Sequence, residues 1–197
     1  MLLAAMMAAA MCNTSKEVAF GDWFCRSAES TLASAPGNAA ARRRLKNAFD
    51  AAKRFGKANS GLGEKEFVEK LKRELYDRHM AAGPDHQRNG FENFDPLLFL
   101  KQMAAVASYA GRDMRKALRI LAAGPGDADT VPSFLGSIMG AWCGAKRLKA
   151  DDSGLSADLA AVADCIRRLY GVAIDRIADC LVDLADKHGC CRKSGGR

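Results

Sequence analysis

The sequence has little of what β-proteins, zinc proteins and disulfide-rich secreted proteins require. Only five of its 197 residues are proline, 7% are aromatic, and no CxxC pair occurs. No stretch shows the period-2 alternation of β-branched residues that is typical of strands, whereas helical periodicity runs from end to end. Ala, Leu, Lys and Arg, which favour helix, are abundant. We therefore expect an all-α protein with one sizeable domain.

The apolar periodicity also predicts where the helices lie. The expected ranges are 2–11, 16–33, 39–55, 64–81, 95–109, 112–122, 131–144, 157–169 and 172–187. Ser15, Asp95 and Ser156 stand at N-cap positions, and Pro96 follows Asp95 at a first helical position. Glycines stand at the expected helix ends: Gly56, Gly83, Gly111, Gly144, Gly171 and Gly189.

The cysteines and histidines form no metal cluster in the sequence. Cys143, Cys165 and Cys180 fall singly within apolar helical patterns, which favours buried reduced thiols over disulfides or a zinc site. The three histidines are scattered, and only His86 lies in a long loop, 82–95. Reduced thiols and the lack of a convincing targeting segment make the cytoplasm the default location.

The charge pattern and the first segment exclude two kinds of partner. The formal net charge of +7 suits an anionic ligand or nucleic acid. However, the basic run 42–57 has no aromatic residues interleaved in the manner of a nucleic-acid platform, so we interpret it as a solvated helix face. The apolar segment 1–11 follows no basic residues and is shorter than the ~20 residues that cross a bilayer. We expect neither a nucleic-acid nor a membrane partner.

The segment 124–144, GPGDADTVPSFLGSIMGAWCG, carries the strongest candidate site. Asp127 and Asp129 immediately precede a predicted helix, so simple N-capping is one interpretation. Two carboxylates and the Thr130 hydroxyl can also converge three hard oxygens on a cation such as Mg²⁺. Gly126 lets a ligand approach the backbone. The glycines at 136, 140 and 144 share one helix face, which favours tight helix packing.

Two known metal motifs compare poorly with this segment. A calcium-binding EF-hand loop needs an oxygen ligand and then a glycine where Val131 and Pro132 stand. The DxDx[TV] motif of haloacid-dehalogenase phosphatases fits the letters DADTV, with Asp127 as nucleophile, but that motif must follow a buried strand. We keep this phosphatase as a distant alternative.

A third interpretation is a family resemblance. AGPGDADTVPSFLGSIMGAWCG resembles the C-terminal metal motif of the ADP-ribosylglycohydrolase family, a GGDxDT segment followed by a helix of small residues. The preceding YAGRDMRKALRIL and the later GVAIDRIADCLVDLADKHG also resemble parts of that family. The likeness covers about 93–187 and is strongest over 117–144.

The resemblance implies a compact multi-helix hydrolase with two Mg²⁺ ions that cleaves the glycosidic bond of ADP-ribosylated proteins or related ADP-ribosyl compounds. Asp127, Asp129 and Thr130 would be metal ligands, and Gly126 would lie against the substrate. The loop 82–95 would line the ADP-ribose cleft, where Phe91 could stack on adenine. A buried core position for Phe91 is the alternative, because most aromatic residues of helical domains simply pack.

The sequence departs from the family pattern in two places. The Thr-Asp-Asp motif, which supplies the other metal ligands, is absent upstream, and Pro125 stands at the family's first glycine. We therefore expect an N-terminally incomplete domain over 1–188, a disordered basic tail over 189–197, and at most a partial metal site with weak or no activity. The alternative function is a non-catalytic ADP-ribose-binding or interaction protein, which would self-associate through the face left by the missing helices.

Overall fold

The computed structural model describes residues 2–11, 18–34, 38–82, 95–149, 154–173, 176–177, 179–180 and 183. Its contacts divide the chain into two compact units, Met1–Ser153 and Gly154–Arg197. Phe91 and His86, residues 184–187 of the predicted helix 172–187 and the predicted tail all lie outside the described residues.

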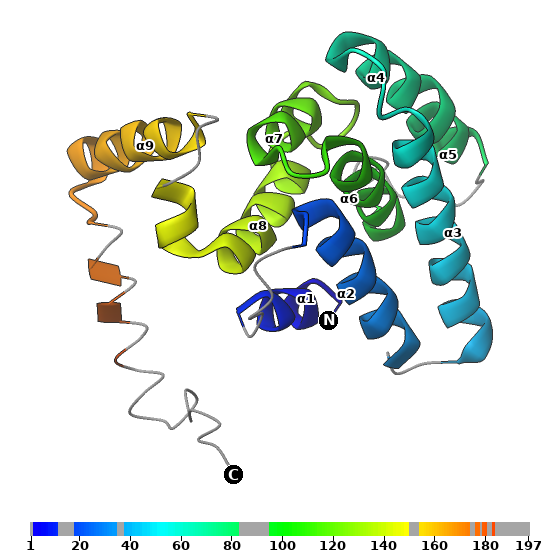
Figure 1. Ribbon diagram of the computed structural model, residues 1–197, viewed down its shortest axis with the longest axis horizontal. Coiled ribbons are helices and arrows are strands. Elements are labelled where there is room, and N and C mark those ends of the chain that lie inside the picture. Colours follow the sequence, from blue (N-terminus) through cyan, green and yellow to red (C-terminus); the bar gives the residue numbers. More distant parts are fainter. Residues whose placement is uncertain are drawn as a thin grey trace. The chain divides into compact units, whose positions relative to one another are not determined.

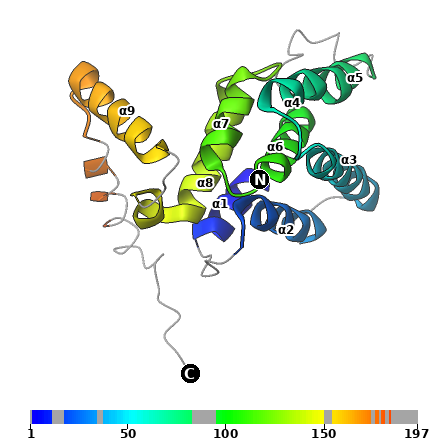
Figure 2. The same cartoon turned by 45° about the horizontal axis from the view of Figure 1, so that its top comes forward.

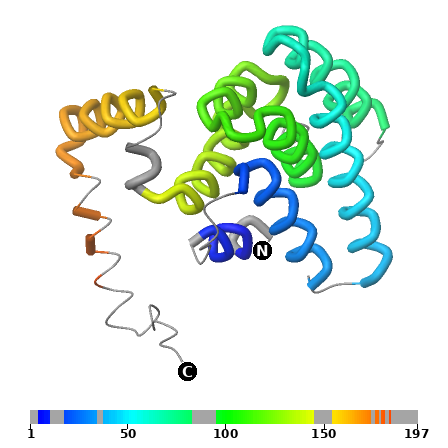
Figure 3. Tube along the Cα trace, in the orientation of Figure 1, coloured from blue at the N-terminus to red at the C-terminus, as the bar shows by residue number. Residues whose placement is uncertain are grey.

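All of the regular structure in the described residues is helical, which confirms the all-α prediction (Figure 1). The first unit contains α1 (Leu2–Met11), α2 (Phe20–Ser34), α3 (Ala39–Ala58), α4 (Glu64–Leu71), a π-helical turn η1 (Lys72–Tyr76), α5 (Asp77–Ala81), α6 (Pro96–Ala110), α7 (Met114–Ala123) and α8 (Thr130–Lys149). The second unit contains α9 (Leu155–Tyr170). Figure 3 traces the path of the chain through these elements. No described helix combines the length and the apolarity needed to span a bilayer.

Helix α6 forms the centre of the first unit. Its sequence, PLLFLKQMAAVASYA, is apolar on nearly all sides, as expected of a helix that neighbours surround. Helices α2, α3, α7 and α8 all pack against it, and Figure 2 shows α2, α3 and α7 grouped around it. Neighbouring helices therefore hold α6 on several sides, and its Gln102 side chain bonds to the Pro125 carbonyl in the loop before α8.

Two glycines outside the predicted glycine face allow the closest helix packing. A Cβ on Gly56 would stand within 2.9 Å of Ser108 Cβ and inside van der Waals contact with the Ala105 carbonyl. Gly21 meets the Ala107 carbonyl in the same way. The prediction that Gly56 ends its helix is wrong, since α3 continues to Ala58. The lack of a side chain at Gly56 instead allows α3 to approach α6 closely.

The predicted tight packing along the glycines of α8 is also wrong. A Cβ on Gly136 would make only ordinary contact with Leu118, and one on Gly140 would meet nothing within 4 Å. Gly144 has φ 69° and ψ 160°, so it interrupts the helical geometry of α8. The predicted helix end at Gly144 thus appears as a break inside a longer helix.

Three of the predicted helix boundaries are confirmed, at Asp95, Gly111 and Gly171. The Asp95 side chain accepts a hydrogen bond from Leu97 N at 2.7 Å, with Pro96 in the first turn. Gly111 and Gly171 end α6 and α9 with positive φ. Ser156, however, is not a cap, because α9 begins at Leu155 after Gly154. The predicted cap Ser15 lies outside the described residues, and α2 begins at Phe20.

The four cysteines within the described residues are free thiols in different environments. Cys143 is buried as predicted, but Cys165 and Cys180 are exposed, which corrects their predicted burial. Cys25 is 1% exposed, and its thiol lies 3.3 Å from Ser108 Oγ. Burial raises the pKa of Cys25 above its ordinary value, because a thiolate would lose its hydration there.

We expect Cys25 to react at least about tenfold more slowly with iodoacetamide at pH 8 than Cys165, because only an accessible thiolate is nucleophilic. Alkylation time courses resolved by peptide mass spectrometry measure both rates in one sample. The difference should vanish in urea, where both thiols are exposed. Equal rates in the folded protein would contradict the burial of Cys25.

Candidate functional site

The loop 124–129 joins the end of α7 to the start of α8 and carries both aspartates of the DxDT segment. Asp127 Oδ1 and Asp129 Oδ1 each accept a hydrogen bond from the Thr130 N–H at 2.9 Å. Two carboxylates that share one donor lie next to each other at the N-terminus of α8. The helix dipole and the free N–H groups there stabilise their negative charge. The capping interpretation is therefore confirmed.

Asp127 does more than a cap requires. Its side chain is 9% exposed, and its second oxygen, Oδ2, is buried with no hydrogen-bond partner, whereas Asp129 is exposed. Burial alone would raise the pKa of Asp127, but hydrogen bonds with Asp129 and Thr130 outweigh that effect and hold the pKa below its ordinary value. Asp127 therefore places a charged, unpartnered oxygen inside the loop.

Two residues that the sequence analysis missed hold this loop in place. The Gln102 side chain, on α6, is 2% exposed and donates from Nε2 to the Pro125 carbonyl at 2.7 Å. Tyr76, the last residue of η1, packs so closely that a Cβ on Gly126 would come within 2.9 Å of its ring. Gly126 also has φ 89°, which side chains rarely allow. The sequence offered one signal for Gln102: it is a polar residue within an almost wholly apolar helix.

Gln102 supplies a second buried oxygen without a donor. Its Oε1 forms no hydrogen bond in the structure, like Asp127 Oδ2. Buried acceptors are nearly always satisfied by protein, water or an ion. Both unsatisfied oxygens belong to side chains that contact or form the loop 124–129, so this part of the molecule is suited to an additional donor or cation.

The donor set of the loop matches a hard cation. Asp127, Asp129 and Thr130 offer two carboxylates and one hydroxyl, and oxygen ligands of this kind suit Mg²⁺ rather than zinc. Within the described residues, however, no group of three or more His, Cys, Asp or Glu side chains could hold a metal ion. The structure thus brings together the predicted residues Gly126, Asp127, Asp129 and Thr130, while the predicted Phe91 lies outside the described residues.

A second buried polar cluster lies where α5 and α6 meet. His79 Nε2 is 2.7 Å from Asp95 Oδ2, and Lys101 Nζ is 3.2 Å from His79 Nδ1. His79 is 8% exposed. Burial lowers the pKa of Lys101 below its ordinary value, although the nearby Asp95 opposes this. His79 and Lys101 also line a cavity of about 320 Å³.

One comparison of the sequence with known proteins found a match. Residues 1–188 match the model of one protein family, ADP-ribosylglycohydrolase. No curated protein and no solved structure matches the chain. The match covers nearly all of the 197 residues and includes the whole loop and its supporting helices. The chain belongs to the ADP-ribosylglycohydrolase family.

Proposed function

We propose that the chain is a hydrolase of this family that acts on the glycosidic bond of ADP-ribosylated proteins or related ADP-ribosyl compounds, with a Mg²⁺-binding site at the loop 124–129. The observation that carries the proposal is the buried Asp127 Oδ2, which is charged and has no hydrogen-bond partner. Such an oxygen is costly to bury unless a cation or water satisfies it.

Each residue of the loop has a distinct role in this proposal. Asp127 and Asp129 contribute carboxylate oxygens, and Thr130 contributes its hydroxyl, at the start of α8. Gly126 leaves room for a sugar beside the backbone, since it carries no side chain. Gln102 and Tyr76 are positioning residues that fix Pro125 and Gly126.

A bound Mg²⁺ would supply Lewis acidity and a template for the ribose hydroxyls and the attacking water. The residues of the chain would orient that ion through the three oxygens of one segment. Mg²⁺ prefers six ligands, so a site with three local protein oxygens would hold it weakly and leave the other positions to water or substrate. We therefore expect slow turnover.

A second candidate is a protein that binds ADP-ribose without cleaving it. The observation that favours it is the engagement of both Oδ1 atoms with the Thr130 N–H, which leaves fewer lone pairs for a metal. In this case the loop would be a structural cap of α8. The oxygens without a hydrogen-bond partner, Asp127 Oδ2 and Gln102 Oε1, would accept hydrogen bonds from ADP-ribose directly.

We expect Asp127→Asn to weaken Mg²⁺ binding by at least about tenfold, because even the loss of a group that only orients a metal ligand typically costs about 10–100-fold in affinity. Asparagine still caps the helix, so the fold should be unchanged. Titration calorimetry measures the binding, and Mn²⁺ in place of Mg²⁺ allows the same titration by electron paramagnetic resonance.

The matched control is Asp113→Asn, an exposed cap of α7 that accepts from Lys116 N at 2.8 Å. It should leave the Mg²⁺ affinity unchanged. A parallel assay follows ADP-ribose release from ADP-ribosylated arginine and serine peptides. Mg²⁺-dependent release that Asp127→Asn abolishes supports the hydrolase, whereas saturable ADP-ribose binding without release supports the second candidate. Unchanged Mg²⁺ affinity in Asp127→Asn would refute the proposed site.

A further inference from the structure

A small pocket lies beside His79, where four elements of the first unit meet. It has a volume of about 320 Å³ and is walled by α3, η1, α5 and α6. Its lining residues are Ala51, Ala52, Phe55, Glu74, Leu75, Arg78, His79, Ala82 and Lys101. Five of these nine residues are apolar. The pocket therefore suits a small ligand with an aliphatic part, and it shares no residue with the loop 124–129.

Within this pocket, His79 connects Lys101 to Asp95 through two hydrogen bonds. Asp95 Oδ2 lies 2.7 Å from His79 Nε2, and a carboxylate only accepts, so Nε2 carries the ring proton. The Lys101 ammonium only donates, so His79 Nδ1, which lies 3.2 Å away, accepts with its lone pair. The lysine nitrogen therefore faces a basic atom of a ring whose other nitrogen bonds to a carboxylate.

This arrangement can remove a proton from Lys101. The distance between Nζ and Nδ1 falls within the reach of a general base, about 2.6–3.2 Å. When the proton moves to Nδ1, His79 becomes an imidazolium, and the Asp95 carboxylate stabilises that charge at Nε2. The amine that remains on Lys101 is neutral, which is the nucleophilic form of a lysine.

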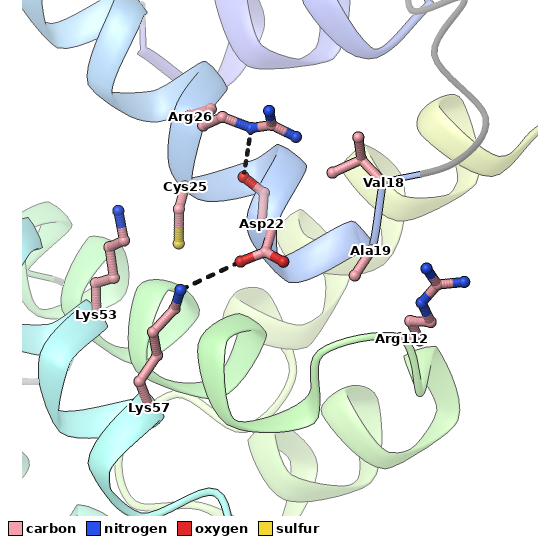
Figure 4. A pocket seen from close by; sticks show the side chains of 8 residues that line it. All are labelled: Val18, Ala19, Asp22, Cys25, Arg26, Lys53, Lys57 and Arg112. Carbon is pink, nitrogen blue, oxygen red and sulfur yellow. Dashed lines mark hydrogen bonds and ion pairs between the residues drawn. The ribbon is translucent and has the colours of Figure 1, made fainter.

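The lysines of α3 have carboxylate partners instead. Lys53 and Lys57 line a different pocket, and Figure 4 shows Lys57 bonded to Asp22, at 3.3 Å. The hydrogen bond from Lys53 to Glu29 raises the pKa of Lys53, whereas burial lowers the pKa of Lys101. Lys101 therefore gives up its proton more readily than Lys53.

The remaining charged residues around the pocket do not replace His79 as the base. Glu74, of η1, bonds to Arg73 at 3.2 Å, and Arg78, of α5, is exposed. The lining residues from α3 carry no charge. Of the described residues that line the pocket, His79 is the one whose basic atom bonds to the lysine nitrogen.

We propose that Lys101 is a reactive lysine that binds a small aliphatic aldehyde covalently as an imine. An aldehyde matches the pocket because imine formation needs a base beside the amine and then an acid at the same place, and one imidazole supplies both. The apolar lining residues would contact the aliphatic part of the aldehyde. Imine formation is independent of the proposed function, because the pocket and the loop 124–129 share no residue.

The reaction needs no reactant besides the aldehyde. The neutral Nζ attacks the carbonyl carbon, and a proton of the amine passes to the carbonyl oxygen, which gives a carbinolamine. The His79 imidazolium then donates its Nδ1 proton to the new hydroxyl group, which leaves as water. The products are a protonated imine on Lys101, one water molecule and a neutral His79.

Reductive trapping with propionaldehyde and sodium cyanoborohydride tests the site in the full chain. Cyanoborohydride reduces an imine to a stable secondary amine, and peptide mass spectrometry then gives the initial rate at each lysine in one sample. At pH 7 we expect Lys101 to be alkylated at least about tenfold faster than the exposed Lys57, because a positioned base typically contributes about 10²–10⁴-fold. In urea the two rates should become similar.

Two variants separate the role of the His79 chain from simple access to the pocket. Asp95→Asn keeps a side chain that caps α6 but removes the charge that stabilises the imidazolium, and His79→Gln removes the base. Each should slow alkylation of Lys101 at least about tenfold and leave Lys57 unchanged, with the helix content by circular dichroism preserved in Asp95→Asn. The imine site is refuted if Lys101 reacts no faster than Lys57 in the folded chain, or if Asp95→Asn leaves the Lys101 rate unaltered.

Discussion

Replacement of Asp95 by alanine is expected to lower the free energy of unfolding by about 3 kcal/mol, because it removes both a helix cap and the carboxylate oxygen that lies against the buried His79 ring. One Asp95 oxygen accepts from Leu97 N at the start of α6, and the other lies 2.7 Å from His79 Nε2. The loss of the cap alone costs about 1 kcal/mol. The loss of the carboxylate oxygen beside the buried His79 ring accounts for the remainder.

The variant Asp113→Ala separates these two contributions. Asp113 caps α7 through the same kind of bond, to Lys116 N at 2.8 Å, but is exposed and has no buried histidine to satisfy. We expect it to cost only about 1 kcal/mol. Urea unfolding followed by circular dichroism measures both variants. Similar losses for Asp95→Ala and Asp113→Ala would show that the His79 contact contributes nothing to stability.

A Gly56→Ala substitution is expected to lower the free energy of unfolding by about 1 kcal/mol in net terms, because it separates α3 from α6. The new methyl group would meet the Ala105 carbonyl and, at 2.9 Å, Ser108 Cβ. Backbone atoms cannot rotate away, so the helices must move apart, and overpacking of this kind costs roughly 1–3 kcal/mol. This cost exceeds the roughly 1 kcal/mol that alanine gains over glycine within a helix.

The control for this prediction is Gly61→Ala, in the turn after α3. A Cβ there would meet nothing within 4 Å. We expect a change close to zero or a slight stabilisation, because alanine reduces the freedom of the unfolded chain. Thermal unfolding of both variants in the same buffer gives the comparison. A stabilised Gly56→Ala protein would mean that the two helices have room to adjust.

The sequence predicted those parts of the candidate site that depend on neighbouring residues. Asp127, Asp129 and Thr130 are adjacent in the chain, so their convergence at the start of α8 needs only a loop and a helix end. Gln102 and Tyr76 lie far from them in the sequence. No local pattern could show that these two side chains contact Pro125 and Gly126, because that contact depends on how η1, α6 and the loop pack.

The same distinction explains the errors about glycine. The spacing of Gly136, Gly140 and Gly144 suggested close helix packing, yet the close approaches occur at Gly21 and Gly56. A missing side chain permits close approach but does not create it. The neighbouring helix must also be present at that face, and α6 is present beside α2 and α3.

Periodicity and capping act over a few residues, so the sequence was enough to predict the all-α class, most helix positions, the helix start at Asp95, the helix end at Gly171 and the pair of acids before α8. The packing of the helices determines that Asp127 keeps a buried oxygen without a hydrogen-bond partner, that His79 pairs with Asp95, and that basic residues of α2, α3 and the α6–α7 turn line one pocket. Burial and contacts of this kind involve residues distant in the chain, so they cannot be predicted before the helices are placed against one another.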